Sequence, residues 1–293
     1  MNLVRALARP EYLHRPRQIV ERLRYAYRSP QGEAWARTPW GLPVWVDAQE
    51  LHGRALLTHG VVDLGVTEVI WRLVEPGDAV VDVGANVGGL TAAMARRVGR
   101  GGSVVAFEPH PATRALLERS AERWSSLGAA PVVVRAEALS STEGTARLHV
   151  PEAFARNSGI ARLVETGDGV DIPTTTFDRV FARDIKLKLV KIDVEGHEDA
   201  VVEGMRETLT DGRVEHIVFE EFRPLPSPLC MTLTTYGFEA FLIDTGIGGP
   251  SLLPVDGTHH APSGRPPNVL ATRSSRDALV RLQPRGFACL GAR

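Results

Sequence analysis

Residues 80–109 read VVDVGANVGGLTAAMARRVGRGGSVVAFEP, and this stretch decides the fold. An apolar run ends in a glycine-rich turn, a helix-like segment follows, and a second apolar run ends at Glu108. A strand, tight turn, helix and second strand with an acid at its tip are typical of a site for an adenosine-containing cofactor. Glycine at Gly84 and Gly88 lets the backbone approach a ligand without a Cβ in the way. The Glu108 carboxylate can accept two hydrogen bonds from a ribose diol.

The same alternation of short apolar runs and helix-like segments continues along the chain. It predicts parallel strands joined by crossover helices, hence an α/β sheet with helices on both faces. The stretch 141–187 interrupts the rhythm, and we expect an inserted hairpin at 146–150 and a loop near the strand tips there. The segment between the last two strands is rich in loop-forming residues and could cover the active face. The predicted strands are 79–83, 103–107, 132–135, 188–192, 214–219, 237–244 and 268–273, and the predicted helices are 88–97, 112–127 and 197–209.

Composition and charge narrow the class of protein. The chain has 293 residues, of which 43% are hydrophobic and 24% charged, an ordinary globular composition. Its net charge of −1 gives no reason to expect nucleic acid or an anionic membrane as partner. No apolar stretch approaches the roughly 20 residues needed to cross a bilayer. Arg5 and Arg9 precede no apolar core of signal-peptide length, so we expect a soluble cytoplasmic protein.

The first residues, 1–37, carry apolar side chains at roughly helical spacing among several arginines. This pattern predicts an amphipathic helix, packed on the main domain or on the partner in a homodimer. A substrate lid and a membrane-surface helix are the alternatives. We divide the chain into an N-terminal helical extension, 1–54, and a main domain, 55–293. The apolar positions are Leu13, Ile19, Val20, Leu23 and Tyr27.

The details of the turn discriminate between cofactors. A nicotinamide-binding turn normally reads GxGxxG, but here Asn86 occupies the middle position. Asp82 adds an anionic group at the strand tip, which repels phosphate and suits the sulfonium and amino groups of S-adenosylmethionine. We therefore expect S-adenosylmethionine rather than a dinucleotide, although Asp82 could instead stabilise the turn and Glu108 could be a solvated strand-end acid. Pro109 belongs to the same cofactor site, and Glu137, after the third strand, could contact the adenine.

Four motifs occur in order along the chain: DVGANVGG at 82–89, AFEPHP at 106–111, EALSSTEGTARLHVP at 137–151 and LKLVKIDVEGHEDAVVEGM at 187–205. Together they resemble the FkbM family of S-adenosylmethionine-dependent methyltransferases, over roughly residues 55–245. The resemblance implies a class I methyltransferase (Rossmann-like) fold with a seven-stranded, mostly parallel sheet whose last strand is antiparallel. It also implies methyl transfer to oxygen, often to a hydroxyl of a small molecule such as a secondary metabolite or a sugar.

Matching motif positions imply roles for single residues. Asp82, Gly84, Asn86 and Gly88 would line the methionine part of the cofactor, and Glu108 would bind its ribose. Two positions depart from the family pattern. His197 stands where the family more often has a small or aromatic residue, and Asp63 stands where related sequences frequently have Glu. Both departures could bear on substrate choice.

The strand tips supply candidates for catalysis, because ligands of open α/β sheets bind outside the carboxyl ends of the strands. Methyl transfer to a hydroxyl needs alignment and a base that removes the proton. Asp193 is our first choice for this base, and His197, which titrates near neutral pH, is the second. Of Glu220 and Glu221, we expect one to reach the cleft, since successive strand side chains point oppositely.

These carboxylates could also hold Mg²⁺, a hard cation that favours oxygen ligands, although hydrogen bonding to the substrate is the simpler role. Glu195 and Glu198 at the next helix start could be capping residues. Transfer to nitrogen is an alternative, but IDVEGH (192–197) lacks the Asn/Asp-Pro-Pro-aromatic turn usual for amines. A non-catalytic cofactor-binding scaffold is another. We expect substrate contacts from the N-terminal helix, 151–170 and 246–266.

Overall fold

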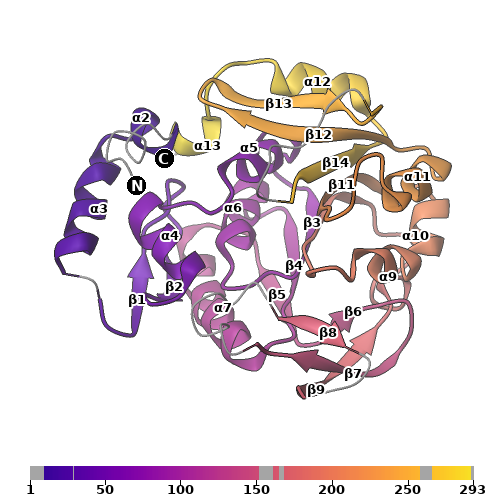
Figure 1. Cartoon of the computed structure of the whole chain (residues 1–293), viewed down its shortest axis with the longest axis horizontal. Coiled ribbons are helices and arrows are strands. Elements are labelled where there is room, and N and C mark those ends of the chain that lie inside the picture. The colour runs from indigo at the N-terminus through magenta and orange to yellow at the C-terminus, as the bar shows by residue number, and fades with distance from the viewer. Residues whose placement is uncertain (1–9, 29, 152–160, 165–167, 258–265, 292–293) are drawn as a thin grey trace.

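The computed structural model describes residues 10–28, 30–151, 161–164, 168–257 and 266–291 (Figure 1). A central eight-stranded sheet has the order β13-β12-β14-β11-β10-β3-β4-β5. Five neighbouring strands of this sheet run parallel to one another: β11, β10, β3, β4 and β5. In chain order, their bounds are Ala79–Val83, Ser103–Phe107, Val132–Arg135, Leu187–Ile192 and Val214–Glu220.

This arrangement confirms the class I methyltransferase fold, with one strand more than predicted. The last strand, β14 (Asn268–Thr272), runs antiparallel to both neighbours, β11 and β12 (Glu239–Gly246). The extra strand is β13 (Gly249–Pro254), which lies in the segment expected to be loop-rich. A tight turn pairs Gly246 with Gly249 and lets 249–254 return antiparallel along β12, where it satisfies an otherwise open sheet edge.

Strand side chains alternate between the two faces, and each face has its own apolar core. Helices α4, α5, α6, α7, α12 and α13 contribute buried side chains to the core that contains Val80 and Leu189. Helices α8, α9, α10 and α11 contribute to the core that contains Val81 and Val190. In chain order the helices are Leu51–His59, Leu64–Leu73, Gly89–Val98, Pro111–Trp124, Phe177–Val180, Glu198–Glu203, Arg206–Thr210, Pro228–Thr235, Ser275–Leu282 and Ala288–Gly291.

A second sheet is inserted between β5 and β10, in place of the single hairpin that we predicted. Its four strands have the order β6-β9-β7-β8, with bounds Ala138–Leu139, Val170–Thr175, Gly144–His149 and Arg162–Val164. Leu148 and Ile172 form a small apolar core with Ala138 on one side of it. Of the segments expected to contact substrate, 152–160, 165–167 and 258–265 lie outside the described residues.

The N-terminal extension holds more than the helix that we predicted. Helices α2 (Pro10–His14) and α3 (Arg17–Tyr27) precede a two-stranded antiparallel sheet of β1 (Glu33–Ala36) and β2 (Val44–Asp47). The buried Trp40 and Val44 belong to the same apolar core as the main sheet. The Trp124 indole on α7 donates to the carbonyl of Pro43 at 2.6 Å. The extension and the main domain therefore share one core, and α4 crosses the predicted boundary at residue 54.

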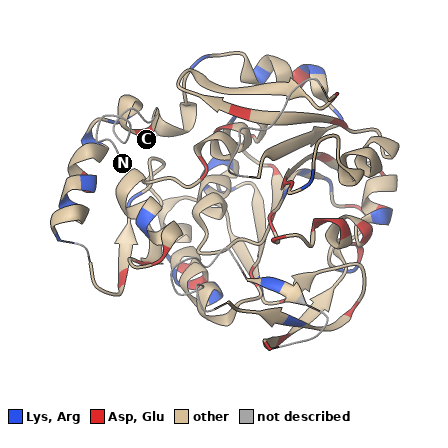
Figure 2. Ribbon diagram, in the orientation of Figure 1, with Lys and Arg blue, Asp and Glu red and all other residues tan. Residues whose placement is uncertain are grey.

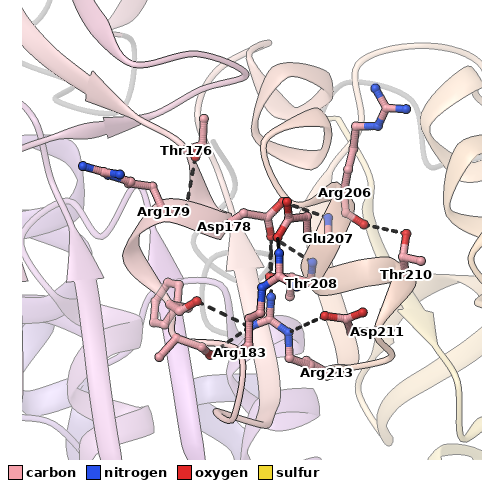
Figure 3. A network of polar contacts seen from close by, with 12 residues as sticks. Thr176, Asp178, Arg179, Arg183, Arg206, Glu207, Thr208, Thr210, Asp211 and Arg213 are labelled. Carbon is pink, nitrogen blue, oxygen red and sulfur yellow. Dashed lines mark hydrogen bonds and ion pairs between the residues drawn. The ribbon is translucent and has the colours of Figure 1, made fainter.

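A polar network lies near the amino ends of β10 and β11 and joins α8, α10 and the turn before β11 (Figure 3). Asp178 accepts hydrogen bonds from the backbone N–H groups of Glu207 and Thr208, both at 2.8 Å, and from the Thr208 hydroxyl at 2.6 Å. It caps α10 from another helix, since the N-cap residue Met205 makes no side-chain cap. The buried Arg213 lies 3.8 Å from the same carboxylate.

Candidate active site

The glycine-rich turn after β3 is tied to both neighbouring strands. The N–H groups of Gly84 and Ala85 donate to the carbonyl of Phe107 at 3.0 and 2.9 Å. Gly84 has φ +80°, and a Cβ there would lie 1.8 Å from the backbone oxygen of Asp193. Gly88 has φ +89°, and a Cβ there would lie 2.4 Å from Leu117 on α7. Both glycines are thus required by close packing inside the protein, before any ligand is considered.

Asn86 forms the centre of this turn and adopts φ +50°, a left-handed conformation that Asn tolerates better than most residues. Its side-chain oxygen accepts from the N–H of Val87 at 2.7 Å. Its own N–H donates to the Glu108 carboxylate at 2.8 Å. The residue that replaces the middle glycine of a dinucleotide turn therefore links the turn to the acid at the tip of β4.

Glu108 is buried, with 7% of its surface exposed, and lies at the edge of a pocket. One carboxylate oxygen accepts from Asn86 and the other from the N–H of His110 at 2.9 Å. Burial raises the pKa of Glu108 to about 7. Each oxygen retains a further lone pair. The carboxylate can therefore accept hydrogen bonds from a diol in the pocket.

Asp82 lies beneath the turn rather than in the pocket. Its carboxylate accepts from the hydroxyl of Thr91 on α6 at 2.5 Å. The side chain is almost fully buried, and burial raises the pKa of Asp82 to about 6. This geometry is that of a turn-stabilising carboxylate. Direct contact of Asp82 with a cofactor stays a prediction.

The pocket opens between the strand tips and the inserted sheet. The polar residues that line it all come from the strand tips and their turns, whereas its described lining residues from the inserted sheet are apolar. Of the residues that we predicted for the site, Gly84, Asn86, Glu108, Pro109, Asp193 and His197 line it, whereas Asp82, Gly88, Glu137 and Glu220 are not among its described lining residues. The lining residues are Val83, Gly84, Asn86, Phe107, Glu108, Pro109, Ala138, Leu139, Leu148, Ala161, Leu163, Asp193, Val194, Glu195 and His197. The Glu137 carboxylate forms an ion pair with Arg135.

The second polar turn, after β10, faces the first one. The N–H of Asp193 donates to the carbonyl of Val83 at 2.9 Å, which joins the tips of β10 and β3. The buried Glu198 accepts from the N–H groups of Val194 and Gly196, both at 3.2 Å. Glu198 therefore stabilises this turn through backbone hydrogen bonds, which is the kind of role that we considered for it as a capping residue.

His197 lines the pocket on the same turn. Its Nε2 lies 3.0 Å from the hydroxyl of Ser140, which follows β6. Burial lowers the pKa of His197, so the imidazole is neutral at neutral pH. The residue thus joins the turn to the inserted sheet, and a neutral imidazole is the form that can accept a proton.

Three carboxylates converge beside the pocket. Asp193, Glu195 and Glu220 each place an oxygen within 4.8 Å of the others. Burial, followed by the negative charge of Asp193, raises the pKa of Glu220 to about 8 and that of Glu195 to about 7. Glu221 is turned away and pairs with Arg223 at 2.8 Å. Of these two glutamates at the end of β11, Glu220 is therefore the one in the carboxylate cluster, and its contact with a substrate in the cleft stays a prediction.

Lys191 is a site residue that we did not predict. It is 1% exposed and lies opposite Asp82 in the register of β10 with β3. Its Nζ lies 3.2 Å from the Asp193 carboxylate. Burial alone would lower the pKa of Lys191, but the charges of Asp193 and Asp82 outweigh burial and raise it. A lysine inside an apolar strand is itself a signal in the sequence, because a buried ammonium needs a partner.

His52 on α4 is a second neighbour that we did not predict. Its Nδ1 lies 3.2 Å from the Glu50 carboxylate. Burial lowers the pKa of His52, but the hydrogen bond to Glu50 and the charges of Asp193 and Glu195 raise it overall. This position follows from the packing of α4 against α3 and the small sheet of β1 and β2, and no local pattern in the sequence indicates it.

The carboxylate cluster offers oxygen atoms of the kind that Mg²⁺ prefers. However, the Lys191 ammonium already lies 3.2 Å from the Asp193 carboxylate, so a cation of the protein itself pairs with one of the three acids. With Asp193 engaged in this way, the three carboxylates do not fit a resident Mg²⁺, and the proposed chemistry uses no metal.

Comparison with known proteins now gives the family. The family model described as the methyltransferase FkbM domain matches residues 82–240, more than half of the chain. This span includes both strand-tip turns and the inserted sheet. No curated protein matches the chain.

Solved structures of methyltransferases superpose on parts of this chain with low sequence identity. A putative rRNA methylase from Clostridium thermocellum is 12% identical, with a TM-score of 0.41 over 71% of this chain and 92% of that chain. An S-adenosylmethionine-dependent O-methyltransferase from Thermotoga maritima is 14% identical, with a TM-score of 0.40 over 83% and 78%. Fibrillarin from Aeropyrum pernix, with bound S-adenosylmethionine, is 16% identical, with a TM-score of 0.40 over 84% of both chains. The family match, rather than these overlaps, decides where the chain belongs.

Proposed function

The chain belongs to the FkbM family of S-adenosylmethionine-dependent methyltransferases, and on this basis we propose that it methylates a hydroxyl of a small molecule such as a secondary metabolite or a sugar. The observation that carries this proposal is the position of Asp193. It lines the pocket together with Glu108 and Asn86, and it also belongs to the carboxylate cluster beside that pocket. One side chain thus borders the region for the methyl donor and the region for an acceptor.

The described pocket residues fit S-adenosylmethionine. Glu108 offers free lone pairs to the ribose hydroxyls, and Leu139, Leu148 and Pro109 offer an apolar surface to the adenine. The Asp193 carboxylate, at the other turn, suits the positively charged methionine end. When bound, the cofactor supplies an electrophilic methyl group on a sulfonium.

Asp193 is the base in this proposal. An acceptor hydroxyl beside it would donate its proton to the carboxylate as the oxygen takes the methyl group; the bond between the methyl carbon and the sulfonium sulfur would break, leaving the thioether S-adenosylhomocysteine. Lys191 holds this carboxylate in place from the buried side at 3.2 Å, and therefore acts as a positioning residue. Alignment of the two reacting groups between the facing turns supplies the rest of the rate enhancement.

His197 and Glu220 are the other catalytic candidates. His197 is neutral and borders the pocket, so it can accept a proton or hydrogen-bond the acceptor. Glu220 has a pKa near 8, so below that pH its protonated carboxyl can donate a hydrogen bond to an acceptor oxygen. We assign both to orientation of the acceptor, with Asp193 as the group that takes the proton.

Transfer of labelled methyl from S-adenosylmethionine to a panel of hydroxylated small molecules tests the proposal. We expect labelled methyl ether products, and a loss of about 100-fold or more in kcat for Asp193→Asn at saturating S-adenosylmethionine. Asp199→Asn is the matched control, because Asp199 is exposed nearby and pairs with Arg223 at 2.9 Å. Labelled amines, labelled macromolecules, or full activity of Asp193→Asn would each contradict the proposal. Cofactor binding without turnover on an identified ligand would favour the non-catalytic scaffold.

A further inference from the structure

Helix α3 presents its apolar side chains to solvent. Val20, Leu23 and Tyr27 are 48%, 61% and 94% exposed, and Leu13 on the preceding α2 is 55% exposed. The spacing of 20, 23 and 27 places these three on one face of the helix. A surface helix of a globular protein normally turns such a face toward the core.

The opposite face of α3 attaches the helix to the protein through polar contacts. Gln18 is buried, and the Tyr25 hydroxyl donates to the carbonyl of Ala48 at 2.6 Å. Arg22 donates to the hydroxyl of the buried Tyr12 at 2.9 Å. Three successive inward positions, 18, 22 and 25, are thus held by hydrogen bonds or burial. The outward direction of the apolar face is therefore fixed by the fold.

Basic side chains border the exposed apolar residues. Arg17, Arg24 and Arg28 are all exposed; on a helical wheel Arg17 and Arg24 lie along one edge of the apolar stripe, and Arg28 directly follows the last residue of α3. Glu21 pairs with Arg24 at 2.9 Å. Figure 2 shows basic residues along α3, which lies at the edge of the molecule away from the inserted sheet and packs beside α4. We call this surface the α3 face; it comprises Leu13, Arg17, Val20, Leu23, Arg24, Tyr27 and Arg28.

We propose that the α3 face binds the surface of an anionic lipid bilayer. A helix with an apolar stripe and flanking arginines lies in the interface plane, with the apolar side chains among the acyl chains and the basic ones at the phosphates. The net charge of −1 for the whole chain does not oppose this, because attraction to a charged surface depends on the local charge within about a Debye length.

Charge favours a bilayer over a second copy of the chain as the occupant. Antiparallel two-fold pairing of this face would place the arginine edges of the two α3 helices side by side, where they repel one another. Anionic headgroups instead complement them. The apolar stripe is short, so the predicted binding is reversible and sensitive to salt.

Flotation of the full chain with lipid vesicles tests the inference. We expect binding to phosphatidylcholine vesicles that contain about a third phosphatidylglycerol, little binding to pure phosphatidylcholine, and release at high salt. The double variant V20E/L23E should bind about tenfold less. The matched control is L279E/V280E on α12, where both residues are also exposed and apolar, at 40% and 54%. Its binding should equal that of the wild type.

Circular dichroism and the melting temperature verify that both double variants are folded. R24Q provides a second, milder test, since it should reduce the preference for phosphatidylglycerol and leave the fold intact. Three results would overturn the inference: no binding of the wild type to anionic vesicles, equal binding of V20E/L23E and wild type, or a dimer in light scattering that V20E/L23E dissociates while no vesicles are bound.

Discussion

Asp82 and Glu108 end neighbouring strands, yet the structure gives them different surroundings. Asp82 is bonded to Thr91 beneath the glycine-rich turn, whereas Glu108 borders the pocket. The sequence predicts that both acids lie at strand tips, because the apolar runs define the strands. It does not predict which lone pairs remain free, since this depends on the path of the turn and on a hydroxyl from the next helix.

Lys191 and His52 mark the limit of prediction at the same scale. A lysine in the apolar strand 187–192 could have been identified as a buried ammonium that requires an acid. His52 could not, because it reaches the cluster only through the packing of α4, and the negative charges that raise its pKa come from residues far along the chain.

Gly84→Ala should destabilise the protein and the pocket together. The new Cβ would overlap the backbone oxygen of Asp193, and the φ of +80° disfavours alanine, so we expect a loss of at least about 2 kcal/mol of unfolding free energy. Gly101→Ala is the matched control, because the nearest atom to its Cβ is 3.8 Å away. Equal thermal unfolding midpoints of the two variants would contradict the close approach of the strand tips.

The raised pKa of Glu220 predicts a specific pH dependence of stability. A carboxyl with a pKa near 8 in the folded protein and an ordinary value of 4.5 when unfolded binds its proton more tightly when folded. Its contribution to stability is therefore present below pH 4.5 and is lost as the pH rises through about 8. Glu220→Gln lacks this titration, so its melting temperature should fall less than that of the wild type between pH 6 and pH 8, by a few degrees. If the melting temperatures of Glu220→Gln and the wild type fell equally between pH 6 and pH 8, the buried environment that we describe for Glu220 would be wrong.

At the scale of elements, local patterns predict the strands and helices of the main sheet well and the inserted sheet poorly. The strands at 79–83, 103–107 and 132–135 agree with the structure to the residue, because apolar β-branched runs bounded by turns are strong local signals. In the insertion, the two-residue β6 pairs with β9 across more than thirty residues. Pairing of such short strands depends on long-range contacts that no window of sequence contains.

Asp178→Ala tests how much the Asp178 side chain contributes to the stability of α8, α10 and the turn before β11. It removes the cap of α10 and leaves the buried Arg213 without this acid, so we expect a loss of about 2–3 kcal/mol. The affinity for S-adenosylmethionine should be unchanged, because α8 and α10 contribute no described residue to the pocket. Urea denaturation and titration calorimetry measure the two quantities. An unchanged unfolding free energy of Asp178→Ala would show that the network in Figure 3 does not stabilise the fold.

At the scale of the whole molecule, the mostly parallel sheet with helices on both faces was predictable, whereas the burial of residues 40–44 in its core was not. The alternation of strands and helices indicates the doubly covered sheet, and the four motifs indicate the family. The N-terminal extension was predicted as a helix packed on the main domain or on a dimer partner, and the structure adds that Trp40 and Val44, beyond that helix, are buried in the main core. This could not be inferred, since an apolar residue in a loop-rich stretch does not reveal which surface covers it. Among the described residues, no helix is long and apolar enough to cross a membrane.

Titration calorimetry of S-adenosylhomocysteine with the wild type and Glu108→Ala tests the central claim most directly, and it requires no knowledge of the acceptor. The claim is that the pocket between the two strand-tip turns binds the methyl donor through Glu108. We predict binding to the wild type with one site, and a dissociation constant about tenfold or more higher for Glu108→Ala, because two hydrogen bonds from the ribose hydroxyls to the buried carboxyl group are lost. Glu118→Ala, at an exposed position of α7, should bind like the wild type. No binding to the wild type, or equal affinity of Glu108→Ala and wild type, would contradict the claim.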